Sequence, residues 1–341
     1  MVTLGADTHK STHTFVVVDD NGRQLAERTV SATPSGHLEA LQWAARWGER
    51  TWAIEDCRHV SRRLESDLLR AGERVLRVPP DLMAGARQSG RVAGKSDPID
   101  ALAVARVALR EPDLPVACLD GPERELRLLV DHREDLIAER TRMQNRLRWH
   151  LHELMPGQQP ATATLDCAAA LGRLEHQLAH LPGTLARLAR DLVWRIAELN
   201  WSIRELERQI EQLVKPLAPT LLRLFGCGSL TAAKLLAETA GVQRFRSRAA
   251  FARFNGSAPI PVSSGNSERF RLNRGGNRQV NAALHRIAVT QLRHPTQGKA
   301  YVERRLANGN SKREAIRALR RRLSDEVYRR LMCDARAVSL T

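Results

Sequence analysis

Four acidic residues in the first hundred positions have the pattern of a divalent-metal site. Asp7 and Glu55 each end a predicted strand, and Asp97 and Asp100 open a predicted helix. Strand ends are the usual place for ligands in α/β sheets. Converging carboxylates repel each other by roughly 4 kcal/mol per pair at 4 Å and an effective dielectric near 20, so a cation must lie between them. Oxygen ligands favour Mg²⁺ or Mn²⁺.

Each of these acids also has an ordinary structural explanation. Asp97-Pro98-Ile99-Asp100 is a good helix start, with Asp97 as the N-cap and proline in the first turn. Like charges three residues apart cost only ~0.2–0.5 kcal/mol, and the helix dipole stabilises each acid by ~0.3–1 kcal/mol. Asp7 could begin a turn, and Glu55 could lie in an exposed loop. The residues alone leave both explanations open.

A serine in a glycine-containing loop is the candidate nucleophile. Ser264 directly precedes Gly265, and the arginines that follow could stabilise charge on phosphorus: Arg269, Arg271, Arg274 and Arg278. A serine-rich turn before a solvated basic helix explains the same residues, and Ser263 leaves the nucleophile ambiguous by one position. Partners for a hydrolase triad cannot be placed, and no GxSxG motif exists.

A Gly-x-Gly turn between two predicted helices is a candidate contact to nucleic acid. Gly226 and Gly228 lie in Phe-Gly-Cys-Gly-Ser-Leu-Thr, a pattern similar to a helix–hairpin–helix. In such a turn, backbone amides and a helix N-terminus can bind a backbone phosphate. An ordinary pair of helices joined by a permissive turn is the alternative.

The distribution of charge supports a nucleic-acid partner. The chain of 341 residues carries a net charge of +16, and residues 221–341 hold 24 basic and 7 acidic residues, a net charge of +17. The first 220 residues hold 30 basic and 31 acidic residues. Such asymmetry indicates a module that faces a polyanion, attached to a neutral one. Codon bias explains why arginine outnumbers lysine but not why acidic residues are so few in the last third.

Cysteine usage and hydropathy exclude several classes of protein. The five cysteines are scattered and never form a CxxC pair, which argues against a zinc site or a disulfide framework. The apolar runs are far shorter than the ~18 residues of a membrane span, and the N-terminus has no signal-peptide core. We therefore expect a cytoplasmic protein without a membrane partner.

The predicted elements divide the chain into three parts. Residues 1–120 read as a strand hairpin followed by alternating helices and strands, which predicts an α/β layer with a mixed sheet. Residues 121–216 contain two long amphipathic helices, at about 123–154 and 184–214, that predict a helical hairpin or coiled-coil arm for oligomerisation. After Lys215-Pro216, residues 217–341 read as a basic, mostly helical domain.

Several collinear motifs together resemble the DEDD transposases of bacterial insertion sequences, the family that includes the pilin-gene invertases. In the first half these are Gly-Ala-Asp7-Thr-His-Lys, Ile54-Glu55 and Gly94-Lys-Ser-Asp97-Pro-Ile-Asp100-Ala. The second half adds Gly226-Cys-Gly228, Phe251-Ala-Arg-Phe-Asn-Gly256-Ser-Ala-Pro259, Ser264-Gly265 and Asn273-Arg-Gly-Gly276-Asn-Arg. Their order and spacing cover nearly the whole chain.

The resemblance implies a fold, a mechanism and partners. It implies a RuvC-like, ribonuclease-H-type first domain in which Asp7, Glu55, Asp97 and Asp100 bind Mg²⁺ or Mn²⁺. It implies a C-terminal transposase domain with Ser264 as the nucleophile that forms a covalent 5′-phosphoserine link to DNA. Members of this family recombine donor and target DNA as tetramers of two dimers, and a bridge RNA guides them. The resemblance implies the same partners and assembly for this chain. Such a bacterial enzyme is expected to act at the nucleoid.

Three other interpretations are weaker. A metal-dependent nuclease, similar to a Holliday-junction resolvase, would use the acids with water as the nucleophile. A sugar-kinase-like ATPase would explain Gly5-Ala-Asp7-Thr before a strand hairpin, but a second phosphate loop is missing and the basic module would have no role. A non-enzymatic nucleic-acid binder would bind with the same steep salt dependence as a recombinase, so only metal-dependent strand cleavage separates the two.

Overall fold

The structure is a computed structural model that describes residues 1–80, 82–83, 96–111, 114–158, 160–161, 164–262, 270–271, 273 and 275–338. Contacts within the chain divide it into two compact units, residues 1–120 and 121–341. Each unit is described by itself. In the part of the chain that is described, no helix combines the length and the apolar character needed to cross a bilayer.

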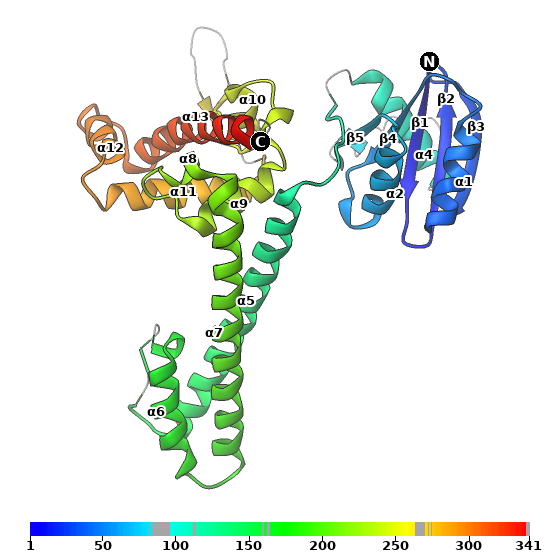
Figure 1. Cartoon of the computed structure of the whole chain (residues 1–341). Helices are drawn as coiled ribbons and strands as arrows, with labels where there is room; N and C mark the ends of the chain where they lie inside the picture. The colour runs from blue at the N-terminus through cyan, green and yellow to red at the C-terminus, as the bar shows by residue number, and fades with distance from the viewer. Residues whose placement is uncertain are drawn as a thin grey trace. The chain divides into compact units, whose positions relative to one another are not determined.

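The first unit is built on a five-stranded mixed sheet of order β3-β2-β1-β4-β5 (Figure 1). Its strands are β1 (Val2–Thr8), β2 (Thr12–Val18), β3 (Gln24–Ser31), β4 (Arg50–Glu55) and β5 (Val75–Val78). The first three strands pair antiparallel, whereas β1, β4 and β5 pair parallel. This order, with β2 alone reversed, is the topology of ribonuclease-H-type domains and confirms the predicted mixed α/β layer.

Helices cover both faces of this sheet. On one face, α1 (Pro34–Ala44) and α2 (Arg58–Arg70) pack over a core that includes Leu4 and Trp52. On the other face lies α4 (Asp97–Arg110), in contact with Gly5 of β1. A Cβ atom at Gly5 would lie 2.1 Å from the carbonyl oxygen of Ala101. Glycine at this position therefore lets the helix backbone approach the strand, and so brings the start of α4 to the end of β1.

Two long helices form a hairpin in the second unit (Figure 1). They are α5 (Pro122–Leu154) and α7 (Thr184–Leu217), which confirms the two predicted helices, although α7 continues through Pro216. Arg133 Nε donates to Glu207 Oε1 at 2.9 Å and Arg140 Nη1 to Asn200 Oδ1 at 2.8 Å, so the helices run antiparallel. Their far ends pack with α6 (Ala168–Ala179) around a separate core.

The rest of the second unit is a cluster of helices that shares its core with the near ends of α5 and α7. Its helices are α8 (Pro219–Leu222), α9 (Ser229–Thr239), α10 (Arg248–Phe254), α11 (Arg278–Leu292), α12 (Gln297–Ala307) and α13 (Lys312–Val338), with a short 3₁₀ turn at Val242–Arg244. Another 3₁₀ turn, Thr164–Asp166, precedes α6 and contributes Leu165 to the separate core. A small antiparallel sheet of β6 (Ile260–Pro261) and β7 (Phe270–Arg271) lies in the glycine- and serine-containing stretch, for which the sequence predicts a loop. The division of this unit into an arm and a C-terminal domain stays a prediction.

Candidate functional site

Asp7 and Glu55 project from the same face of the central sheet. Gly5 of β1 pairs with Ala53 of the parallel strand β4. Asp7 lies two residues after Gly5, and Glu55 lies two residues after Ala53. Because strand side chains alternate between faces, both acids share the face of Gly5, against which α4 packs. The strand register therefore places the two acids at corresponding positions on neighbouring strands.

The other two acids lie in the first turn of α4. Ser96 is the N-cap and Asp97 the first helical residue, so the N-cap role predicted for Asp97 is wrong by one position. The Asp97 side chain is half exposed, with Oδ1 3.4 Å from Nε2 of His9. Asp100 is buried, and its charge acts on Asp7. Asp97 thus points its carboxylate toward the end of β1.

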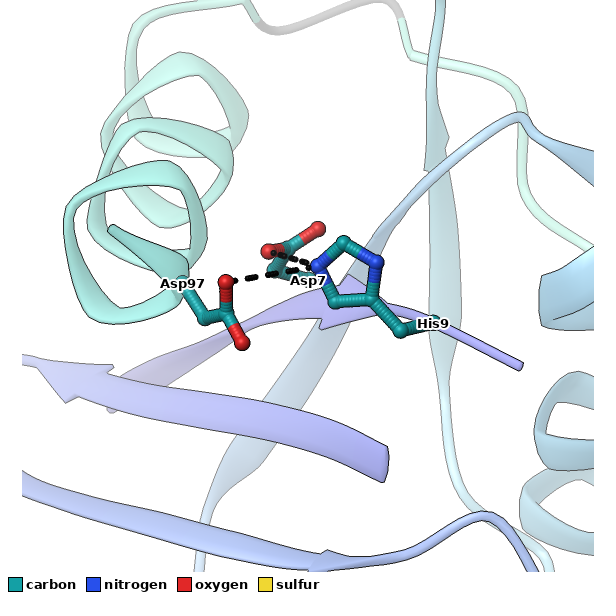
Figure 2. Close-up of side chains that lie close together, drawn as sticks. All are labelled: Asp7, His9 and Asp97. Atoms are coloured by element: carbon teal, nitrogen blue, oxygen red, sulfur yellow. Dashed lines mark hydrogen bonds and ion pairs between the residues drawn. The ribbon is translucent and has the colours of Figure 1, made fainter. Parts of the chain in front are cut away.

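His9 connects the strand end to the helix start (Figure 2). Its Nε2 lies 3.1 Å from Asp7 Oδ2 as well as 3.4 Å from Asp97 Oδ1. The turn after β1 is closed by a hydrogen bond from His9 N to Thr12 O at 2.9 Å. Among the described residues, one group could hold a metal ion, with ligand atoms within 4.8 Å of one another: Asp7, His9 and Asp97.

Sequence reasoning missed His9. The residue stands in the quoted motif, but no role was given to it. Its position two residues after Asp7, on a segment predicted to be extended, is the signal that could have placed it on the same face.

Burial and like charge both act on the Asp7 carboxyl. The Asp7 side chain is 10% exposed, whereas those of His9 and Asp97 are 51% and 50% exposed. Burial raises the pKa of Asp7 above its usual value, His9 opposes this, and the carboxylates of Asp100 and Asp97 raise the pKa further. The ionised form of Asp7 is therefore disfavoured in the folded chain by burial and by the neighbouring carboxylates.

The structure brings some of the predicted acids together more closely than others. Asp7 and Asp97 share the group with His9, and Asp100 lies near enough to influence Asp7. Glu55 lies on the same face at the end of β4 but is not a member of the three-residue group. The role of all four acids as metal ligands stays a prediction.

The candidate nucleophile belongs to a segment outside the described residues. Ser263, Ser264, Arg269 and Arg274 all fall there, whereas Arg271 and Arg278 are described and exposed. What the structure does describe is how the two ends of the segment are held. The strands β6 and β7 pair, with Ile260 opposite Arg271.

We call residues 256–276 the serine segment, and close backbone contacts join its two ends. Asn277 N donates to Phe254 O at 2.6 Å. Gly256 and Gly276 both have positive φ, +69° and +84°, and a Cβ on Gly276 would lie 2.6 Å from Phe254 O. Both glycines of the quoted motifs are therefore needed for the chain to pass close to itself at this point.

Polar side chains reinforce the same junction. Asn255 is fully buried and donates from Nδ2 to Ser324 Oγ at 2.8 Å. Asn281 Nδ2 donates to Asn255 O at 2.9 Å. Leaving a buried amide without these hydrogen bonds would lower the folding stability by about 1–3 kcal/mol. The base of the serine segment, where its two ends meet, is therefore fixed in one arrangement.

The two glycines of the Gly-x-Gly turn have different surroundings. Gly226 has φ +89°, and a Cβ there would lie 3.0 Å from Ile287 O of α11, so its small size serves packing. Gly228 is the N-cap of α9 and has open space where a Cβ would lie. It borders a hollow of about 590 Å³ lined by acidic as well as basic side chains, including Glu134, Glu207 and Lys234. The phosphate contact of this turn stays a prediction.

Two family models match the chain. Residues 4–156 match the model for DEDD transposases of the IS110 type, described as Transposase, and residues 218–303 match the Transposase IS116/IS110/IS902 family. The first range contains all four acids and the second contains Ser264. The matched ranges thus cover both candidate sites.

Individual relatives are similar over different lengths. The insertion element IS900 42 kDa protein of Mycobacterium paratuberculosis is 28% identical over 373 aligned positions, 94% of this chain and 93% of that protein. The insertion element IS116 44.8 kDa protein of Streptomyces clavuligerus is 33% identical over 172 positions, 50% of this chain and 42% of that protein.

Two solved structures of RuvC from Thermus thermophilus also match part of the chain. The complex with a Holliday junction substrate has 18% sequence identity and a TM-score of 0.25, covering 32% of this chain and 94% of that chain. The second RuvC structure has 20% identity and a TM-score of 0.25, covering 31% and 92%.

Proposed function

Because this chain belongs to the IS116/IS110/IS902 family of transposases, we propose that it cuts and rejoins DNA by metal-assisted phosphoryl transfer through a covalent phosphoserine intermediate. The observation that carries the proposal is the meeting of Asp7, His9 and Asp97 where a strand end and a helix start come together. Carboxylates gathered at such an edge are suited to hold a cation against a phosphodiester.

The residues present fit a divalent cation. Asp7 is buried, and its raised pKa reflects burial and the neighbouring carboxylates of Asp100 and Asp97, which a bound cation would relieve. We infer that Asp7, Asp97 and Asp100, with Glu55 from the next strand, hold Mg²⁺ or Mn²⁺. Such ions, when bound, stabilise charge on the attacking and leaving oxygens of phosphoryl transfer. His9 keeps the carboxylates of Asp7 and Asp97 directed toward each other.

Ser264 is the proposed nucleophile, with Ser263 as the neighbouring alternative. Its oxygen forms a bond to phosphorus, the bond from phosphorus to the 3′ oxygen breaks, and that oxygen takes up a proton. A 5′-phosphoserine ester remains, and it keeps the energy of the original phosphodiester. A 3′ hydroxyl of another strand can then reverse the step without ATP. The fixed ends of the serine segment, at Asn255 and Asn277, support this role.

The partners follow from charge and from exposed aromatic residues. The net charge of +17 on residues 221–341 supports contacts with donor DNA, target DNA and a bridge RNA. On the α5–α7 hairpin, Trp149, Trp194 and Trp201 are exposed at 73%, 65% and 69%. Aromatic residues are enriched in interfaces, so these tryptophans support the proposal that the hairpin joins copies of the chain into a tetramer of two dimers.

The central experiment is recombination of a donor and a target plasmid by the purified chain with Mg²⁺ and the element's own folded RNA. We expect a covalent protein–DNA adduct on denaturing gels with wild type and with Ser263→Ala, and none with Ser264→Ala. Asp7→Ala should abolish strand cleavage. Free 3′-hydroxyl ends without any adduct would instead support the alternative, a metal-dependent nuclease or resolvase in which water attacks.

A mixing experiment tests whether the acids and the serine act in one site built by two chains. Asp7→Ala and Ser264→Ala chains are each expected to be inactive alone. If one chain supplies the acids and another supplies the serine, mixed oligomers should recover part of the activity. Absence of any recovery in verified mixed oligomers would contradict a site shared between subunits.

A further inference from the structure

A second group of charged residues lies on α11 and α13, outside the acidic site. We call it the arginine cluster, and its members are Arg278, His285, Arg317 and Arg320. Arg278 and His285 are seven residues apart on α11 and so share one side of that helix. Arg320 of α13 donates from Nη1 to Oδ1 of Asn281 at 2.8 Å, and Asn281 stands between them on α11.

The electrostatics of the cluster agree with the contact between Arg320 and α11. Burial lowers the pKa of Arg320, and the guanidiniums of Arg317 and Arg278 lower it further. Burial also lowers the pKa of His285, with Arg320 adding to the effect. The effects of Arg317 and Arg278 on Arg320, and of Arg320 on His285, require cations in close proximity, so the two helices direct like charges into one region.

The cations of this cluster lack a counter-ion among the described residues. Three other arginines on α13 have one, since Arg321 pairs with Asp325, and Arg329 and Arg330 pair with Glu326. Within the described part of the chain, Arg278, Arg317 and Arg320 form no ion pair, and the buried Nε of Arg320 has no hydrogen-bond partner.

The acid closest along the helix does not neutralise the cluster. Glu314 precedes Arg317 by one turn, and its Oε2 accepts hydrogen bonds from both N and Oγ of Ser311 at 2.8 Å. These bonds lower the pKa of Glu314 more than the charge of Arg317 does. Three guanidiniums in one region, with no ion pair among the described residues, leave positive charge that an anion would stabilise.

The arginine cluster is tied to the base of the serine segment. The Asn281 side chain that accepts from Arg320 also donates to Asn255 O at 2.9 Å. Asn255 in turn donates to Ser324 Oγ on α13 at 2.8 Å. One connected set of hydrogen bonds therefore joins Arg320 to the residue at which the chain enters the serine segment.

We propose that Arg278, Arg317 and Arg320 form a subsite that binds a phosphodiester of a nucleic-acid backbone at the base of the serine segment. The choice of this anion rests on the proposed recombinase function. Guanidinium groups match phosphate oxygens in geometry, and they stay charged at working pH even when partly desolvated. Contacts of this kind fix the position and register of a strand and carry no sequence information. The subsite would hold a strand in position relative to the nucleophile.

The test measures binding of full-length protein in EDTA, so that no chemistry occurs. The probes are a fluorescent DNA duplex of arbitrary sequence and, in a separate arm, a fluorescent RNA hairpin. Anisotropy gives affinities from about 50 to about 500 mM KCl, and each lost phosphate contact should reduce the salt slope on duplex DNA by about 0.9. Over that tenfold range, the ratio of wild-type to variant affinity then falls about eightfold.

Four variants separate the subsite from general charge. Arg317→Gln and the double variant Arg317→Gln/Arg320→Gln are expected to lose about one and two contacts. Arg320→Lys, which keeps the charge, should recover part of the double variant's loss when combined with Arg317→Gln. Arg329→Gln removes the same charge from the same helix at a paired position, so its slope should stay near wild type.

The outcomes are distinct. A reduced slope in the DNA arm, the RNA arm or both supports the subsite and identifies the source of the phosphodiester. Unchanged slopes for Arg317→Gln and the double variant, or an equal loss in Arg329→Gln, would overturn it. Arg317 is exposed, so its substitution leaves packing intact, and thermal unfolding verifies this. Strand cleavage with Mg²⁺ is scored separately, so a failure of the recombinase proposal is not confused with a failure of the subsite.

Discussion

Nε2 of His9 lies 3.4 Å from Oδ1 of Asp97, although 88 positions separate the two residues in the chain. The first belongs to the turn after β1 and the second to the first turn of α4. Their meeting depends on Gly5, which lets α4 lie directly on β1. This relationship locates the candidate metal centre, and four predictions follow from its surroundings and from the core beside it.

Asp7→Asn should stabilise the metal-free protein at neutral pH by about 0.5–2 kcal/mol, as is common when a functional site is neutralised. The pKa of Asp7 is raised in the folded chain, so the folded state is penalised once the carboxyl ionises. The penalty is full above the folded pKa and vanishes as pH falls below the unfolded value. Urea unfolding in EDTA across this pH range measures the effect.

Asp20→Asn is the matched control for this prediction, because Asp20 is exposed and its contact with the N-terminus is a weak surface pair. It should change stability little at any pH. Added Mg²⁺ should stabilise wild type more than Asp7→Asn, since only the ionised site binds it well. A lower stability for Asp7→Asn at neutral pH in EDTA would contradict the prediction.

His9→Ala should weaken binding of Mn²⁺ by about 10- to 100-fold, the range typical for residues that orient metal ligands. The imidazole contacts both Asp7 and Asp97, and without it their carboxylates would turn toward solvent. Titration calorimetry with Mn²⁺ measures this. His59→Ala removes an exposed histidine of the same unit as a control. Equal affinities for His9→Ala and wild type would show that His9 has no such role.

Gly5→Ala should destabilise the first unit by about 1–3 kcal/mol or more, because the new methyl group overpacks the contact with α4. The added Cβ would lie 2.1 Å from a backbone oxygen, which no side-chain adjustment can relieve. Displacement of α4 should also weaken Mn²⁺ binding. Gly48→Ala is the control, since nothing lies within 4 Å of its added Cβ. Similar unfolding midpoints for the two variants would refute the expected close contact.

His13 should make the first unit sensitive to acid. It is buried and stacked on His37 with ring centroids 5.2 Å apart, and burial lowers its pKa to about 4, with His37 adding to the effect. The folded state binds this proton less readily than the unfolded chain. Stability should therefore fall as pH drops from about 6.5 to about 4, by roughly 3 kcal/mol in total.

His13→Gln removes the titrating group. The dependence of folding stability on pH between about 6.5 and about 4 should therefore become flatter, whatever the effect of the substitution at neutral pH. Unfolding by urea, followed at several pH values, measures the slope. His132→Gln is the control, because that histidine is exposed and belongs to the second unit. A slope in His13→Gln as steep as in wild type would assign the acid sensitivity to another group.

Local sequence patterns predicted the elements well where short-range physics dominates. The strand hairpin expected near the start of the chain is present, and Gly22 of its Asn21-Gly22 turn takes φ +75°. The regular apolar spacing of α5 and α7 predicted both helices close to their observed bounds. The pair β6 and β7 was missed, because two-residue strands leave no periodic signal.

What the sequence by itself determined was the inventory: the acids, the serine loop, the helices and the charge of the last third. Strand alternation and helix periodicity are local properties, so they can be read from neighbouring residues. Only the tertiary structure decided that His9 joins Asp7 and Asp97, that Gly5 admits α4, and that Arg320 connects through Asn281 to the serine segment. These contacts link positions far apart in the chain, and their geometry depends on how the packed elements meet.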